Sequence, residues 1–102
     1  DRRGIDIHAG SSDVHILDNE IIDAGLKFTV PGINVTGTQV VGEFEIIGNT
    51  VKQKAVLMNR AVYTTRTQGR MIGNRAYGKY LSSGSEFAGG AGLTKIDNVL
   101  YA

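Results

Sequence analysis

The sequence lacks the features that mark several large classes of protein. Its 102 residues include no cysteine, which excludes disulfides, thiolate metal sites and cysteine nucleophiles. Its 11 basic and 10 acidic residues leave a net charge of +1, so we expect no binding to nucleic acid or to an anionic membrane. No apolar run approaches the roughly 20 residues that span a bilayer, so we expect no membrane insertion. We recognise no leader, and the chain starts with Asp rather than Met, so we expect a processed chain or a piece of a longer one.

Helix-forming stretches are also scarce. The chain has a single proline but 14 glycines, and Val, Ile and Thr recur without runs of Ala, Leu, Glu and Lys. β-Branched residues are enriched in strands, and glycine is common in the tight turns that join strands. We therefore predict an all-β protein.

One pattern occurs four times, at residues 14–21, 44–51, 69–76 and 93–100. Each copy has an aliphatic residue two positions before an asparagine, an Asp or Gly directly before it, and a small or apolar residue two positions after it. Successive asparagines are 30, 25 and 24 residues apart. A period of this length marks a solenoid, in which each unit buries its apolar face against its neighbours.

The period and the short alternating stretches predict a right-handed parallel β-helix of about four coils, which we expect to be cut from a longer protein. The coils are residues 1–25, 26–54, 55–79 and 80–102, and together they form a single segment. Residues 33–41 lengthen the second period, and we expect a protruding hairpin or a widened loop there. The last coil lacks a polar cap, so we expect further protein or a partner at this end.

Alignment on the asparagines predicts which side chains face the core. Three columns are predicted to point inward: Val14/Phe44/Gly69/Leu93, Leu17/Ile47/Ile72/Ile96 and Ile21/Val51/Ala76/Leu100. A fourth column, Ile16/Ile46/Met71/Lys95, ends in a charge, which indicates an exposed end or a shifted register. We expect the asparagines to occupy sharp bends in the left-handed conformation and to form a ladder of amide hydrogen bonds, rather than to bind a ligand.

A further column, His15/Glu45/Arg70/Thr94, is predicted to point outward. Because coils stack about 4.8 Å apart, Glu45 is expected to reach both His15 and Arg70. Two interpretations remain open, a cross-strand charge pair at an exposed site and a functional role in binding or catalysis.

Residues 4–22 resemble the repeat of pectate-lyase-like right-handed β-helix proteins, and above all that of the bacteriophage tailspikes that bind or cleave glycans. The other three coils keep mainly the aliphatic–asparagine–aliphatic centre of the pattern. The resemblance implies an elongated homotrimeric shaft that holds a surface polysaccharide on its outer face or between subunits. It also implies that acidic residues on adjacent coils or subunits do any chemistry, although the fold carries many functions.

Two candidate groups follow from the residues themselves. Asp6 and His8 are two residues apart in an alternating strand, so they face the same side about 7 Å apart. They could form an acid/base pair or bind sugar hydroxyls, and Arg2 and Arg3 add donors beside them. The alternative is a solvated strand face. We assign Asp6, His8 and Glu45 as candidate catalytic residues, and we assign a second set to glycan binding: Arg2, Arg3, His15 and Arg70.

Other chemistries find little support in the sequence. Asp18 and Asp97 lie three coils apart, too far for the paired carboxylates of a glycosidase. The two imidazoles and the glycine-rich residues 89–94 do not form a metal motif, and no P-loop is present, so we expect no metal and no cofactor. The tyrosines are expected either to stack on sugars or to fill gaps between coils or subunits.

We therefore expect a segment of a phage tailspike or similar receptor-binding protein that binds a bacterial surface polysaccharide and, in the enzymatic interpretation, depolymerises it. Its expected place is outside the cell or on the virion. The alternatives are a non-catalytic structural or adhesive β-helix and a secreted polysaccharide lyase or hydrolase.

Overall fold

The computed structural model describes residues 5–7, 13–22, 31–36, 43–53, 59–80 and 84–101. Every regular element in these ranges is a β-strand, so the described chain is all-β, as predicted. None of these residues belongs to a helix that could cross a lipid bilayer. The strands are β1 (Ile5–Ile7), β2 (Val14–Leu17), β3 (Glu20–Ile22), β4 (Ile33–Val35), β5 (Phe44–Ile47), β6 (Thr50–Lys52), β7 (Val62–Thr64), β8 (Arg70–Ile72), β9 (Arg75–Tyr77), β10 (Phe87–Ala88), β11 (Thr94–Ile96) and β12 (Val99–Tyr101).

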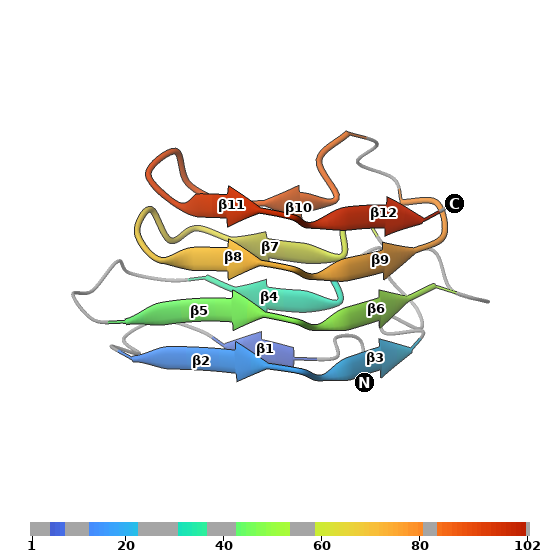
Figure 1. Ribbon diagram of the computed structural model, residues 1–102, viewed down its shortest axis with the longest axis horizontal. Coiled ribbons are helices and arrows are strands. Elements are labelled where there is room, and N and C mark those ends of the chain that lie inside the picture. The colour runs from blue at the N-terminus through green and yellow to red at the C-terminus, as the bar shows by residue number, and fades with distance from the viewer. Residues whose placement is uncertain are drawn as a thin grey trace.

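The strands form three parallel sheets of four strands each. Their orders are β1-β4-β7-β10, β2-β5-β8-β11 and β3-β6-β9-β12, so every third strand along the chain lies in the same sheet. Figure 1 shows that each successive set of three strands forms one layer and that the layers are stacked in chain order. This arrangement is solenoid-like and is consistent with a parallel β-helix.

The start of the second layer differs from our expectation. We predicted that residues 33–41 would protrude as a hairpin or widened loop, but Ile33–Val35 forms β4, a regular strand that pairs with both β1 and β7. The expectation was wrong here because Ile33 and Val35 alternate with Asn34 and so continue the buried columns of the first sheet. Residues 37–41 lie outside the described ranges.

The core confirms one of the predicted inward columns and most of a second, and it corrects the third. Val14, Phe44 and Leu93 are buried, as are Ile21, Val51 and Ala76, but Leu100, which continues the second column in the last coil, is 42% exposed. Ile16, Ile46 and Met71 of the fourth column are also buried. The register of β11 with β8 puts Lys95 in line with them at an exposed end.

The column Leu17/Ile47/Ile72/Ile96 was wrongly predicted to point inward. Leu17 and Ile96 are 47% and 49% exposed, and Ile47 and Ile72 are partly exposed. Side chains alternate along a strand, so once positions 14 and 16 face the core, position 17 must face outward. The structure therefore has a continuous aliphatic column on its outer surface, which we call the aliphatic column.

The four asparagines form the predicted ladder. Asn49 donates from its Nδ2 and its backbone N–H to Asn74 Oδ1, both at 3.0 Å, and Asn74 donates in the same way to Asn98 Oδ1. The Nδ2 of Asn49 also donates to the Ile16 carbonyl at 2.8 Å, and that of Asn74 to the Ile46 carbonyl. Asn49 and Asn74 are completely buried, so these bonds satisfy polar groups that have no access to water.

The left-handed residue at each bend is the one before the asparagine. Asp18, Gly48, Gly73 and Asp97 have φ angles of 54°, 70°, 65° and 57°. We predicted this conformation for the asparagines, and that was wrong because their side chains must turn into the core to make the ladder. Glycine adopts positive φ without strain, and Asp is among the few other residues that tolerate it, which explains the Asp or Gly at this position in all four repeats.

The ladder makes a quantitative prediction for stability. Asn74→Ala removes an acceptor from two donors of Asn49 and a donor from the Ile46 carbonyl, and unsatisfied buried groups cost about 1–3 kcal/mol each. We expect the free energy of unfolding in urea to fall by more than about 3 kcal/mol. Asn19→Ala is the matched control, because exposed Asn19 makes one side-chain bond to Asn49, and we expect it to cost about 1 kcal/mol. Equal costs at the two positions would contradict a cooperative ladder.

Tyr80 closes the third layer with a buried phenol. Its side chain is 6% exposed, and its O–H lies 3.0 Å from the Tyr77 carbonyl and 3.3 Å from the Val51 carbonyl. Burial raises the pKa of Tyr80 to about 12, and the nearby Glu86 carboxylate adds to this shift. The neutral phenol is therefore the form that the fold accommodates.

This shift predicts a loss of stability in alkali. Above pH about 10 the unfolded chain loses the Tyr80 proton while the folded chain keeps it up to about pH 12, so the free energy of unfolding should fall across this interval. Tyr80→Phe removes the titrating group, and we expect a smaller fall in the variant than in the wild type when both are unfolded in urea at pH 9 and pH 11. An identical fall in the two proteins would assign the effect to the other tyrosines and lysines.

Candidate functional site

The outward column predicted from the sequence lies on the second sheet. The register places His15 beside Glu45, Glu45 beside Arg70, and Arg70 beside Thr94 in β2, β5, β8 and β11. Their neighbours along β2 and β5 are buried apolar residues, so alternation turns these side chains to the solvent. We call His15, Glu45 and Arg70 the charged column.

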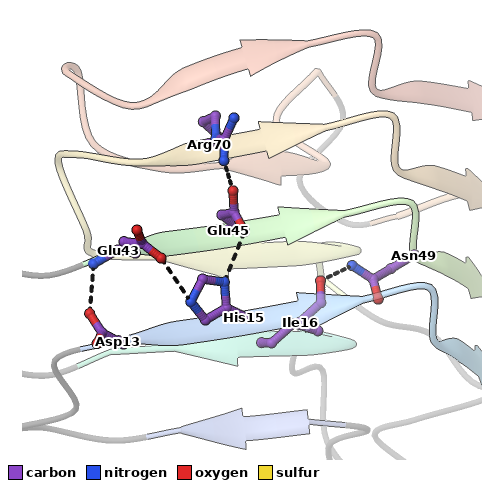
Figure 2. Close-up of polar contacts among 7 residues, drawn as sticks. All are labelled: Asp13, His15, Ile16, Glu43, Glu45, Asn49 and Arg70. Carbon is purple, nitrogen blue, oxygen red and sulfur yellow. Dashed lines mark hydrogen bonds and ion pairs between the residues drawn. The ribbon is translucent and has the colours of Figure 1, made fainter.

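The side chains of the charged column contact one another from coil to coil. Nδ1 of His15 lies 2.8 Å from Glu45 Oε1, and the Arg70 guanidinium pairs with Glu45 Oε2. Figure 2 shows Glu45 between the two basic residues, with His15 on one side and Arg70 on the other. The sequence prediction that Glu45 reaches both partners is thereby confirmed.

Two further carboxylates extend this cluster. Glu43 Oε1 lies 3.3 Å from Nε2 of His15, so that both ring nitrogens of His15 face carboxylates. Asp13 Oδ1 accepts a hydrogen bond of 2.8 Å from the backbone N–H of Glu43 and holds the start of β5 against the start of β2 (Figure 2). Sequence reasoning missed Glu43 and Asp13, although the spacing of Glu43 and Glu45 already put them on one face of an alternating strand.

The side chains of this cluster differ in how far they are exposed to solvent. The Glu45 side chain is 16% exposed, whereas those of Arg70 and Glu43 are 57% and 78% exposed. Ion pairs at such sites are worth about 0–1 kcal/mol each, so they add little to the stability of the sheet. Their main effect is to hold one exposed cation and one exposed anion in fixed positions on the outer face.

This geometry does not suit acid/base cleavage by the two glutamates. A glycosidase needs its two carboxylates on either side of the scissile bond, with room between them for the substrate. Here the His15 imidazole lies between Glu43 and Glu45 and contacts both. Glu45 is also paired with Arg70, so neither of its oxygens is left without a partner.

Asp6 lies on a different sheet from Glu45. It is in β1, in register with Asn34 of β4, and its Oδ1 accepts a hydrogen bond of 2.9 Å from Asn34 Nδ2. Asp6 is exposed, but Asn34 is buried and serves to fix the carboxylate. The structure thus does not bring Asp6 and Glu45 together, and the other candidates near Asp6, namely Arg2, Arg3 and His8, lie outside the described residues.

The tyrosines on the third sheet are occupied by contacts between coils. The rings of Tyr77 and Tyr101 stack at 4.8 Å between centroids with 16° between their planes. Lys52, from the coil on the other side of β9, places its Nζ 5.9 Å from the Tyr77 centroid. The Tyr77 ring therefore contacts the neighbouring coils on both sides of β9, which agrees with the gap-filling interpretation, while Tyr77 is still 37% exposed.

No group of three or more His, Asp or Glu residues in the described part of the chain is placed to hold a metal ion. Comparison with known proteins finds no matching family model, no similar curated protein and no similar solved structure. The resemblance to β-helix proteins therefore rests on the repeat itself and on the stacked parallel sheets.

Proposed function

We propose that this chain is a segment of a tailspike-like, receptor-binding shaft outside the cell or on a virion, and that its charged column binds a bacterial surface polysaccharide. The observation that carries the proposal is the exposed arrangement of Arg70 beside Glu45 and of Glu43 beside His15. Guanidinium groups donate strong charge-assisted hydrogen bonds to hydroxyls and to sugar acids, and carboxylates accept such bonds from hydroxyls. Fixed side chains bind with a smaller loss of conformational entropy than mobile ones do.

Binding without cleavage is the form of this function that the geometry favours. The His15 ring between the two glutamates and the pairing of Glu45 argue against depolymerisation by this cluster. A structural or adhesive β-helix is the second candidate, and it is favoured by the tight coil-to-coil contacts of the same side chains. A secreted lyase or hydrolase is the third candidate, and the charged column does not favour it, because its two neighbouring glutamates both contact His15.

The finer architecture belongs to the same proposal. We propose the right-handed, pectate-lyase-like form of the β-helix, because connections between parallel strands of one sheet are right-handed in nearly all proteins. We also propose a homotrimer. Its support is the aliphatic column, since a continuous row of exposed apolar side chains is a common mark of an interaction surface.

Polysaccharide binding is tested with a panel of bacterial capsular and lipopolysaccharide glycans, followed by calorimetry on those that bind. A hydrogen bond to a charged group contributes enough that Arg70→Ala should weaken binding by about tenfold or more. Arg75→Ala is the matched control, because Arg75 is an exposed arginine in the same coil on the third sheet and its loss changes the net charge equally. We expect Arg75→Ala to retain affinity within about twofold.

Two results would count against this proposal. If Arg70→Ala and Arg75→Ala weaken binding equally, the glycan senses net charge and not the charged column. If the folded wild-type chain binds no polysaccharide of the panel, the structural or adhesive candidate replaces this one.

The trimer is tested by sedimentation velocity over a range of concentrations. We expect the wild type to sediment as a trimer and the double variant Ile47→Lys, Ile72→Lys to sediment as a monomer. The reason is that burying a lysine charge in an apolar interface costs more free energy than the contacts of the lysine methylene groups return. Ile22→Lys is the control, since Ile22 is an aliphatic residue on the third sheet that is 47% exposed. A wild-type monomer at all concentrations contradicts the trimer.

A further inference from the structure

Two exposed side chains of opposite charge lie on the outer face of the second sheet (Figure 2). Arg70 begins β8 in the third layer, and Glu43 directly precedes β5 in the second. Their side chains are 57% and 78% exposed. Both layers are internal, since β2 and β11 of the same sheet lie on either side of them. Further coils at either end of the stack would therefore leave both side chains exposed.

The backbone of Glu43 is held in place although this residue precedes the strand. Its N–H donates to Asp13 Oδ1 at 2.8 Å, and its carbonyl accepts a hydrogen bond of 2.9 Å from the Val14 N–H. In its side chain, Oε1 contacts Nε2 of His15 at 3.3 Å. Among the described residues, no group donates a hydrogen bond to Oε2 of Glu43. The carboxylate therefore offers an acceptor to a ligand.

The guanidinium of Arg70 offers donors in the neighbouring coil. It pairs with Oε2 of Glu45, whose side chain is only 16% exposed and lies beneath it. A guanidinium has five N–H donors in a planar fork, more than a contact with one carboxylate oxygen uses. Glu45 thus orients Arg70, and the more exposed cation is the group that an incoming ligand meets.

The two charges have a defined spacing on this face. Glu43 comes two residues before Glu45, and Glu45 is the register partner of Arg70. Two residues along a strand span about 7 Å, and neighbouring coils lie about 4.8 Å apart. Ile47 of the aliphatic column lies on the opposite side of Glu45, so an apolar contact there leaves Glu43 accessible. An extended chain of sugars can therefore meet an anion and a cation in turn.

We propose that the charged column selects a polysaccharide whose repeat unit carries both a free amino group and a carboxylate. The ammonium group of one sugar binds Glu43, and the carboxylate of a neighbouring sugar accepts hydrogen bonds from Arg70. This assignment rests on the proposed function, since it gives the chemical class of the ligand at the same site.

Selection arises from repulsion as well as attraction. A uniformly acidic chain gains contacts with Arg70 but brings its other carboxylates close to Glu43 and Asp13. A uniformly cationic chain gains contacts with Glu43 but brings its other amines close to Arg70. A neutral chain gains only hydrogen bonds from its hydroxyls. The alternating ligand is the one that meets an opposite charge at both positions.

The test uses four forms of one hexasaccharide of alternating glucuronic acid and glucosamine. The N-acetylated form is acidic, the N-deacetylated form carries both charges, and carboxyl reduction of each gives a neutral and a cationic form. We expect the form with both charges to bind the full chain about tenfold or more tightly than each of the other three, as measured by calorimetry.

Variants assign each preference to its side chain. Glu43→Gln should bring the form with both charges within about twofold of the acidic form, because the amine loses its charged partner. Arg70→Ala should bring it within about twofold of the cationic form for the same reason. Glu20→Gln and Arg75→Ala are the matched controls on the third sheet, since each changes the net charge equally at an exposed site. Both controls should keep both preferences.

The outcomes separate this inference from the proposed function. If the form with both charges binds no more tightly than the acidic and cationic forms, or if Glu43→Gln keeps the preference for the amine, the ligand class is wrong. The proposed function stands in that case, provided that Arg70→Ala still weakens binding of a bacterial polysaccharide and Arg75→Ala does not. If the wild type binds neither the panel of bacterial polysaccharides nor any of the four forms, the proposed function fails together with this inference.

Discussion

The buried asparagine ladder is the constraint on which the rest of the structure depends. Each internal amide joins three coils, since Asn49 donates to Asn74 above it and to the Ile16 carbonyl below it, and accepts from Asn19. These directional bonds lock neighbouring coils at one register, which hydrophobic packing alone would not do. Since side chains alternate along each strand, a fixed register also fixes every outward column.

The repeat in the sequence was sufficient to predict the stacked parallel strands, the ladder and the pairing of Glu45 with His15 and Arg70. It was sufficient because all three follow from one alignment on the asparagines. The errors came where hydrophobicity was given more weight than alternation. Leu17 and its equivalents are aliphatic, but they follow an inward residue directly, and geometry places them outside. The left-handed conformation was predicted for the asparagines but belongs to the residue before each of them. The bend needs both a positive φ and a buried amide, and two neighbouring residues provide them.

The sequence did not reveal those parts of the site that depend on contacts between coils outside the repeat. Glu43 precedes the repeat, and its position opposite Asp13 is known only once β2 and β5 are paired. The contact of Asp6 with Asn34 likewise requires that Ile33–Val35 be recognised as a strand of the first sheet. Lys95 stands in line with three buried aliphatic or thioether side chains, and such an exception can be recognised only after the column has been established.

Core and surface chemistry in this fold are therefore two consequences of the same register. A slip of β5 by one residue against β2 would turn Glu45 into the apolar interior and expose Phe44 and Ile46, which are now 2% and 0% exposed. The cost of burying that charge unpaired would far exceed the small energy of its surface ion pairs. The charged column thus contributes to specificity of register even though it contributes little to stability.

The charged column lies beside the aliphatic column on the outer face of this sheet, two residues away along each strand. Alternation and stacking thus place polar and apolar side chains in adjacent columns on the outer face of the same sheet.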